Sequence, residues 1–199
     1  MQSALPSILL ARHGETAWSL TGQHTGCRTD LPLTERGERN AVRLGERLAG
    51  VKMPHVFCSP LIRARRTCEL AGFLSQAIID PDLVEWDYGD YEGIKTKEIR
   101  QTVPGWSVFI HGAPNGESVA DATARVDRVI AKLRALNDDA ILFSSGHFLR
   151  LMAARWCGWA PQQGKQLLLD TATICVLGYE HTLNEPAIRL WNDARHVGD

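Results

Sequence analysis

The residues of this chain best suited to chemistry are Arg12 and His13, which directly follow a short apolar run over residues 8–11. The run predicts a buried strand, and Gly14 permits a turn immediately after it. In open α/β sheets, ligands bind outside the carboxyl ends of the strands, so both side chains are expected where a ligand would lie. A histidine there can attack phosphorus while the neighbouring guanidinium holds the phosphate.

Two further segments, residues 56–64 and 141–148, repeat this order of apolar strand, turn and helix. In the first, Ser59 is expected to cap a helix whose first turn contains Arg63. The second segment carries His147 at its junction. If the three strands are parallel neighbours, their junctions face one crevice, where helix N-termini offer N–H groups and a positive dipole end. The set predicts an oxyanion site with phosphate as its natural ligand.

Each of these residues alone also has an ordinary structural interpretation. A single histidine at a strand end is most often a surface or capping residue. Arg63 lies beside Arg65 and Arg66, and a basic helix face is usually only solvated. The functional interpretation therefore depends on the repetition of one local pattern at three places.

The elements that must position these residues alternate along the chain. Strands are expected at residues 7–12, 55–59, 77–79, 140–144, 173–179 and 187–191. One helix is expected over residues 34–49 with Thr34 as its N-cap, and another from Ser118 onwards. This alternation predicts a sheet with parallel pairs and helices on both faces. Residues 86–117 are rich in Gly, Trp and Tyr, and we expect them to form an insertion that covers the site.

Composition narrows the class of protein. The 199 residues predict a single domain over residues 1–199, and 44% of them are apolar. A net charge of −1 without runs of one sign disfavours a nucleic-acid or membrane-surface protein. No segment approaches the ~18 apolar residues of a membrane span, and the start has no secretory pattern. The five cysteines show no C-x-x-C spacing, which predicts reduced thiols and a cytoplasmic location.

The sequence Arg-His-Gly-Glu-Thr at residues 12–16 resembles the signature of the histidine phosphatase superfamily, which includes the cofactor-dependent phosphoglycerate mutases. Four more stretches resemble family motifs in the same order: the S-x-L-x-R-A-x-x-T helix start, the acidic motif, the G-E-S turn and the second histidine motif, at residues 59–67, 83–93, 116–118 and 145–150. The resemblance covers residues 8–150. It implies an α/β fold, a three-layer sandwich with a mostly parallel central sheet.

Within the superfamily, residues 22–26 and 85–93 look closest to the sedoheptulose-bisphosphatase-like branch, as does Trp18-Ser19 after the first motif. The mutases carry an Arg-Arg pair and a longer insertion after the acidic motif. Between Gly93 and Gly116 this chain has Lys95, Lys97 and Arg100 but no such pair. The difference favours hydrolysis, and a phosphoglycerate mutase remains an alternative.

The resemblance also implies roles for individual residues. His13 would be the nucleophile that forms a phosphohistidine, Arg12, Arg63 and His147 would hold the phosphoryl oxygens, and Glu85 would protonate the leaving alkoxide and then help to activate water. The predicted substrate-binding residues are Ser19, His24, Thr25, Gly26, Tyr88, Gly146 and Phe148. The positive groups make a metal unnecessary, so neither a metal nor another cofactor is expected. The expected partner is a small phosphorylated metabolite, and a homodimer is left open.

Three alternatives compete with this mechanism. Asp80 and Asp82 follow an apolar run in a D-x-D-x-V pattern like the nucleophile strand of haloacid-dehalogenase-type phosphatases, which need Mg²⁺. A cysteine-based phosphatase is disfavoured because no cysteine has an arginine six residues later. A non-catalytic module that binds phosphorylated ligands is the third, and the joint presence of His13, Glu85 and His147 argues against it.

Overall fold

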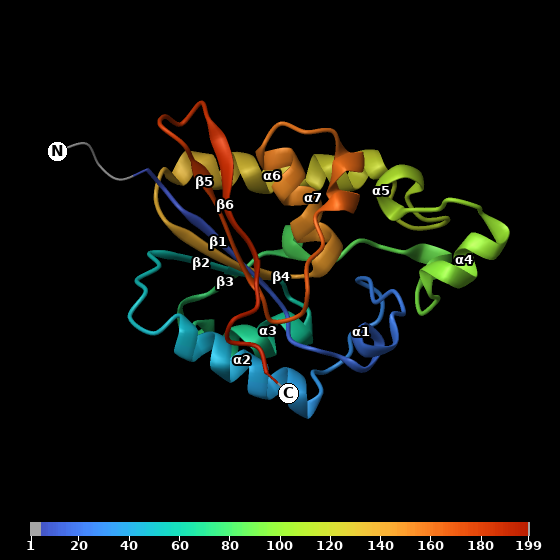
Figure 1. Ribbon diagram of the computed structural model, residues 1–199, viewed down its shortest axis with the longest axis horizontal. Coiled ribbons are helices and arrows are strands. Elements are labelled where there is room, and N and C mark those ends of the chain that lie inside the picture. Colours follow the sequence, from blue (N-terminus) through green and yellow to red (C-terminus); the bar gives the residue numbers. More distant parts are fainter. Residues whose placement is uncertain (1–4, 199) are drawn as a thin grey trace.

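A six-stranded sheet runs between two layers of helices in the computed structural model, which describes residues 5–198 (Figure 1). The strands are β1 (Ile8–Arg12), β2 (His55–Cys58), β3 (Ile78–Ile79), β4 (Ala140–Ser144), β5 (Ile174–Tyr179) and β6 (Pro186–Asp193). They lie in the order β3-β2-β4-β1-β5-β6. All six predicted strands are therefore present, with ends within two residues of those expected.

The neighbouring pairs β3/β2, β2/β4 and β4/β1 are parallel, whereas β5 is antiparallel to both β1 and β6. Among the described strands, β5 alone thus runs against the others. The predicted α/β fold with helices on both faces is confirmed. The parallel order β2-β4-β1 brings together the three junctions singled out in the sequence.

Helices cover both faces of the sheet, with α2 and α3 below it and α6 and α7 above it in Figure 1. The helices are α1 (Ala17–Thr21), α2 (Glu35–Arg47), α3 (Ile62–Leu70), α4 (Thr96–Thr102), α5 (Val108–His111), α6 (Val119–Leu136) and α7 (Gly146–Trp156). Short 3-10 turns are η1 (Leu74–Gln76), η2 (Pro81–Leu83), η3 (Gly89–Tyr91) and η4 (Pro161–Gln166). None of the helices within residues 5–198 is long and apolar enough to cross a membrane.

Side-chain alternation along β1 divides the core into two parts. Ile8 and Leu10 pack into the cluster with α6 and α7, whereas Leu9 and Ala11 pack into the cluster with α2 and α3. A strand buried on both faces in this way has a continuous apolar sequence, as residues 8–11 do. The strand is packed on both faces, so the positions of Arg12 at its end and of His13 directly after it are well defined.

The start of α3 differs from the prediction. Thr34 caps α2 as expected, with its hydroxyl accepting from the Gly37 N–H, but Ser59 does not cap α3. The helix begins at Ile62, whose N–H donates to the Asp30 carboxylate at 2.9 Å. A carboxylate 32 residues away in sequence therefore replaces the local cap. Arg63 still lies in the first helical turn.

Residues 86–117 hold η3, α4 and α5 and lie on the side of the sheet where β1, β2 and β4 end (Figure 1). Trp86, Tyr88, Trp106 and Phe109 are buried and belong to the apolar cluster above the sheet, together with residues of α6 and α7. The description of this segment as an insertion that covers the site stays a proposal.

Candidate active site

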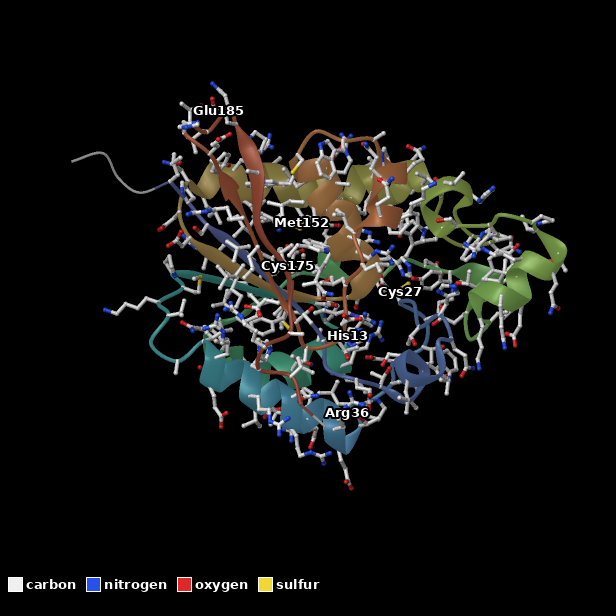
Figure 2. All side chains as sticks on the ribbon, in the orientation of Figure 1. His13, Cys27, Arg36, Met152, Cys175 and Glu185 are labelled. Carbon is white, nitrogen blue, oxygen red and sulfur yellow. The ribbon has the colours of Figure 1, made fainter. Side chains whose placement is uncertain are left out.

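A cleft of about 440 Å³ lies where β1 and β4 end. It is lined by Arg12, His13, Ser19, Gln23, His24, Thr25, Glu85, Tyr88, Gly146, His147, Arg150 and Leu169. Figure 2 shows His13 at this end of the sheet, between the two helical layers. The lining of the cleft comes from five separate stretches of chain.

His13 is held rigidly at the end of β1 and is only 5% exposed. Its backbone N–H donates to the Ser144 carbonyl at 2.9 Å, and the ring nitrogen Nδ1 lies 2.8 Å from the Gly14 carbonyl oxygen. A carbonyl can only accept, so Nδ1 carries the proton and Nε2 keeps a lone pair. Burial, together with the charges of Arg63 and Arg12, holds the pKa of His13 well below its ordinary value. The ring is therefore neutral at physiological pH, with a lone pair on Nε2.

The turn after His13 depends on two glycines in close contact. A Cβ on Gly14 would lie 2.5 Å from the Gly37 carbonyl oxygen, and a Cβ on Gly37 would lie 2.3 Å from the Glu15 carbonyl oxygen. The Gly14 N–H donates to the Thr67 hydroxyl at 2.9 Å, and that hydroxyl donates to the Arg63 carbonyl at 2.7 Å. The first and second junctions are thus joined directly.

The guanidinium groups of Arg12 and Arg63 each donate hydrogen bonds to backbone carbonyls. Arg12 donates to the Leu169 carbonyl, and Arg63 donates to the carbonyls of Thr25, Gly26 and Thr29. The Nε of each arginine has no hydrogen-bond partner although it is buried. Buried guanidinium donors without partners are unfavourable unless an anion completes them, so the two arginines indicate an anion site.

Glu85 is bound to the start of α7. Its Oε1 accepts from the N–H groups of Trp86 and Phe148 at 2.9 and 2.8 Å, and its Oε2 accepts from the His147 N–H at 2.9 Å. Three donors fix the carboxylate in one orientation at the cleft wall. Its place beside the cleft suits an acid or base that acts on the outer side of a bound phosphate.

The outer side of the cleft is aromatic. The ring centroids of His24 and Tyr88 lie 4.6 Å apart, and those of His24 and His147 lie 5.8 Å apart. His147 Nδ1 is hydrogen-bonded to the Tyr88 hydroxyl, and His24 Nε2 lies 3.0 Å from the Thr96 hydroxyl. Burial lowers the pKa of His24 to about 4, and burial plus Arg150 holds that of His147 well below its usual range. Both rings are neutral near pH 7.

The sequence profile of the histidine phosphatase superfamily (branch 1) matches residues 8–194. The chain belongs to this superfamily. It is 40% identical over 185 residues to a Mycobacterium tuberculosis acid phosphatase, covering 91% of this chain and 90% of that one. It is 31% identical to the sedoheptulose 1,7-bisphosphatase of Saccharomyces cerevisiae, covering 96% and 94%. The solved structure of a Mycobacterium tuberculosis open reading frame superposes with a TM-score of 0.89 at 38% identity, covering 94% and 97%.

These comparisons confirm the predicted superfamily and the class of enzyme, a histidine phosphatase. The matched region extends beyond residue 150, where the motifs end, to include β5 and β6. The cleft of this histidine phosphatase brings together most of the predicted site residues. Arg12, His13, Ser19, His24, Thr25, Glu85, Tyr88, Gly146 and His147 line it. Arg63 is fully buried behind its wall.

Two predicted substrate contacts are placed differently by the structure. The Phe148 ring is buried beneath the Arg125 guanidinium, 5.0 Å from its Cζ, and its N–H is taken by Glu85. The Gly26 N–H, expected to meet phosphate, donates instead to Glu92 Oε1 at 2.9 Å. Neither residue lines the cleft, and the two contacts stay predictions. In both cases a carboxylate from the acidic motif takes the N–H.

The structure adds residues to the cleft of the histidine phosphatase that the motifs did not single out. Gln23, Arg150 and Leu169 line it, and Ser145 lies at the end of β4 beside His13. Arg150 follows His147 by three residues, and this helical spacing could have indicated a shared face. Leu169 belongs to the chain before β5, and an apolar side chain gives no signal of a functional site.

The aspartate alternative is not supported. Asp80 pairs with Lys132, and Asp82 pairs with Arg128 at 2.8 Å. Neither carboxylate lines the cleft, and both are satisfied by salt bridges beside η2. The five cysteines all lie within the described residues and form no disulfide there; Cys58, Cys68 and Cys175 are buried.

Proposed function

We propose that this histidine phosphatase hydrolyses phosphate monoesters of small metabolites through a phosphohistidine at His13. One observation carries the proposal: a neutral imidazole with a free Nε2 stands beside two guanidinium groups that lack partners at Nε. A neutral imidazole can attack phosphorus, and the arginines supply positive charge where the phosphoryl oxygens would lie.

The reaction divides into two displacements at phosphorus. His13 Nε2 forms the first new bond to phosphorus while the bond to the ester oxygen breaks, and protonated Glu85 gives its proton to the departing alkoxide. Water then attacks the phosphohistidine as Glu85 takes up a proton, which releases inorganic phosphate and the free imidazole. Glu85 has the required position, because it lines the same cleft as His13 and is fixed by three N–H donors.

A second cavity supports a substrate with a further anionic group. It holds about 460 Å³ and shares His24, His147 and Arg150 with the cleft. Arg100, Arg150 and Lys165 line it, and none of the three forms a salt bridge with a carboxylate in the described part of the chain. Cations without carboxylate partners around a cavity favour an anionic ligand. A sugar bisphosphate would place its second phosphate there, in line with the bisphosphatase relative.

Release of inorganic phosphate from matched sugar monophosphates and bisphosphates tests this function. We expect hydrolysis of both classes, with the lower KM for the bisphosphate. Replacing Arg100 and Lys165 together by Gln should raise the KM for the bisphosphate on the order of 10-fold and leave that for the monophosphate within about 2-fold, since one charge-assisted contact is worth roughly 1.4 kcal/mol or more. Lys52→Gln, an exposed lysine outside both cavities, is the control. Binding of these esters without any phosphate release would instead support the non-catalytic alternative.

A further inference from the structure

Five buried polar side-chain atoms in residues 5–198 lack a hydrogen-bond partner, and three of them belong to residues at the junctions that follow β1, β2 and β4. They are Arg12 Nε, Arg63 Nε and Ser145 Oγ. The two arginines are expected to bind anions. Ser145 has no assigned role, yet its side chain is 0% exposed and its hydroxyl lacks a partner.

The register of the sheet places Ser145 beside His13. Arg12 pairs with Ser144 in the parallel β1/β4 ladder, and the His13 N–H donates to the Ser144 carbonyl. The next residue on each strand is therefore His13 on one and Ser145 on the other. Ser144 points to the α7 side, where its hydroxyl donates to the Leu83 carbonyl at 2.6 Å. By alternation, Ser145 points to the α3 side of the sheet, as His13 does. Arg63 lies in the first turn of α3 on the same side.

The hydroxyl of Ser145 is also free of the role that its position normally implies. Ser145 is the N-cap of α7, with φ −120° and ψ 167°, and a capping serine accepts from the second or third N–H of its helix. Here the N–H groups of His147 and Phe148 both donate to Glu85. A carboxylate from another segment has replaced the cap, and the Ser145 hydroxyl is left for something else.

We propose that Ser145 Oγ–H donates to an oxygen of the phosphoryl group at His13, as the third donor beside Arg12 and Arg63, and that His147 serves the leaving-group side instead. The proposal deepens the proposed function and rests on it. A hydroxyl can rotate to meet either the ester phosphate or the transferred phosphoryl group, so one serine can act in both displacements.

The surroundings of His147 agree with this division. Its Nδ1 is bonded to the Tyr88 hydroxyl, and its ring lies 5.2 Å from Phe109 and 5.8 Å from His24, centroid to centroid. His147 lines both the cleft and the second cavity. It thus lies where the remainder of a substrate would extend, away from the junction of β1 and α3.

Ser145→Ala tests the proposal, with Ser144→Ala as the matched control on the opposite face of the same strand. Orthovanadate, which can take up the geometry of the transferring phosphoryl group, and inorganic phosphate are the probes, measured by calorimetric binding. Ser145→Ala should weaken vanadate binding and should lower kcat for p-nitrophenyl phosphate on the order of 10²–10³-fold, as expected for loss of one transition-state donor. Ser144→Ala should lower Tm but change vanadate binding by less than about 3-fold.

Two further variants distinguish Ser145 from His147. Ser145→Thr retains the hydroxyl and should restore most of the vanadate affinity. His147→Ala should change vanadate binding by less than about 3-fold and impair turnover of a sugar phosphate more than that of p-nitrophenyl phosphate. The proposal is overturned if vanadate affinity survives Ser145→Ala and is lost in His147→Ala. Vanadate binding that follows this pattern in a chain without turnover would keep the assignment of Ser145 and refute only the hydrolytic function.

Discussion

The imidazole of His13 and the carbonyl of Gly14 form a hydrogen bond of 2.8 Å between adjacent residues. This bond lies at a turn that approaches Gly37 too closely for Gly14 to carry any side chain. It fixes the tautomer of His13 and directs the unprotonated Nε2 away from the backbone. The glycine turn thus sets the tautomer of the proposed nucleophile, and burial, together with the charges of Arg63 and Arg12, keeps its pKa low and the ring neutral.

His13→Ala should abolish phosphatase activity and leave the fold intact, because the side chain lies at a strand end outside both apolar clusters. Wild-type protein quenched with acid after brief exposure to labelled substrate should carry an acid-labile, base-stable label, and His13→Ala should carry none. His181→Ala, which changes an exposed histidine of the β5–β6 turn, is the control. A label that survives hot acid would identify a different nucleophile.

Stability should fall as the solution is acidified, because His24 is buried. Its pKa is 6.5 in the unfolded reference and about 4 in the folded chain, so between these values the unfolded state binds more protons and gains stability as pH falls. At roughly 1.4 kcal/mol per pKa unit, His24 should account for on the order of 2 kcal/mol of the free energy of unfolding lost between pH 7 and pH 5.

Urea unfolding at the two pH values measures this loss. His24→Gln removes the titration and retains a group able to bond to Thr96, so it should lose less stability on acidification than the wild type. His13 and His147 have lowered pKa values too and contribute in the same direction in both proteins. An equal loss in wild type and variant would rule out His24 as the source.

Phosphatase activity should survive EDTA, since Arg12 and Arg63 supply the positive charge that a metal would otherwise bring to the phosphoryl oxygens. Initial rates before and after dialysis against EDTA should agree within experimental error. Complete loss of turnover, restored by Mg²⁺, would contradict the histidine mechanism and would support the Mg²⁺-dependent aspartate mechanism at Asp80 and Asp82.

The sequence predicts the part of the site that depends on strand ends. Arg12, His13 and Arg63 could be located because apolar runs of suitable length precede them and because parallel neighbours must end at one edge. The carboxylates that accept from the first N–H groups of the neighbouring helices could not be found in this way. Asp30 at the start of α3 and Glu85 at the start of α7 reach their helices across 32 and about 60 residues of sequence.

The choice between Ser145 and His147 shows the same limit. Residue type alone favours a histidine as the second group at the phosphate, and the motif contains one. The pairing of Arg12 with Ser144 instead brings Ser145 next to His13, and this register is a property of the folded sheet. The placement of Phe148 depends on the fold in a related way, because its side chain packs against Arg125 of α6 and its N–H donates to Glu85.

Glu85→Gln should impair substrates with poor leaving groups most. An alkyl phosphate releases a basic alkoxide that needs a proton, whereas p-nitrophenolate needs little help, so we expect a loss on the order of 10²–10³ for a sugar phosphate and a clearly smaller loss for p-nitrophenyl phosphate. The amide also places an NH₂ against one of three N–H donors, at a cost of about 1–3 kcal/mol in stability.

The ratio of the two losses is therefore the informative quantity, because a general weakening of the start of α7 affects both substrates alike. Glu117→Gln, which loosens another partly buried acid paired with Arg125, is the control for such weakening. Equal losses on both substrates in Glu85→Gln would remove Glu85 from the role of acid.

Hydrolysis should prevail over isomerisation. A mutase must keep its phosphoenzyme from water while the substrate reorients, and it must hold the carboxylate of a phosphoglycerate. The segment over residues 94–116 contributes a single arginine, Arg100, and the cavity that it borders shares His24 and His147 with the cleft. In the proposed mechanism, water reaches the phosphohistidine from that side. We expect inorganic phosphate from a small sugar phosphate or bisphosphate, and little interconversion of 2- and 3-phosphoglycerate even after priming with 2,3-bisphosphoglycerate. Isomerisation faster than phosphate release, followed by phosphorus NMR under these conditions, would place the enzyme with the mutases.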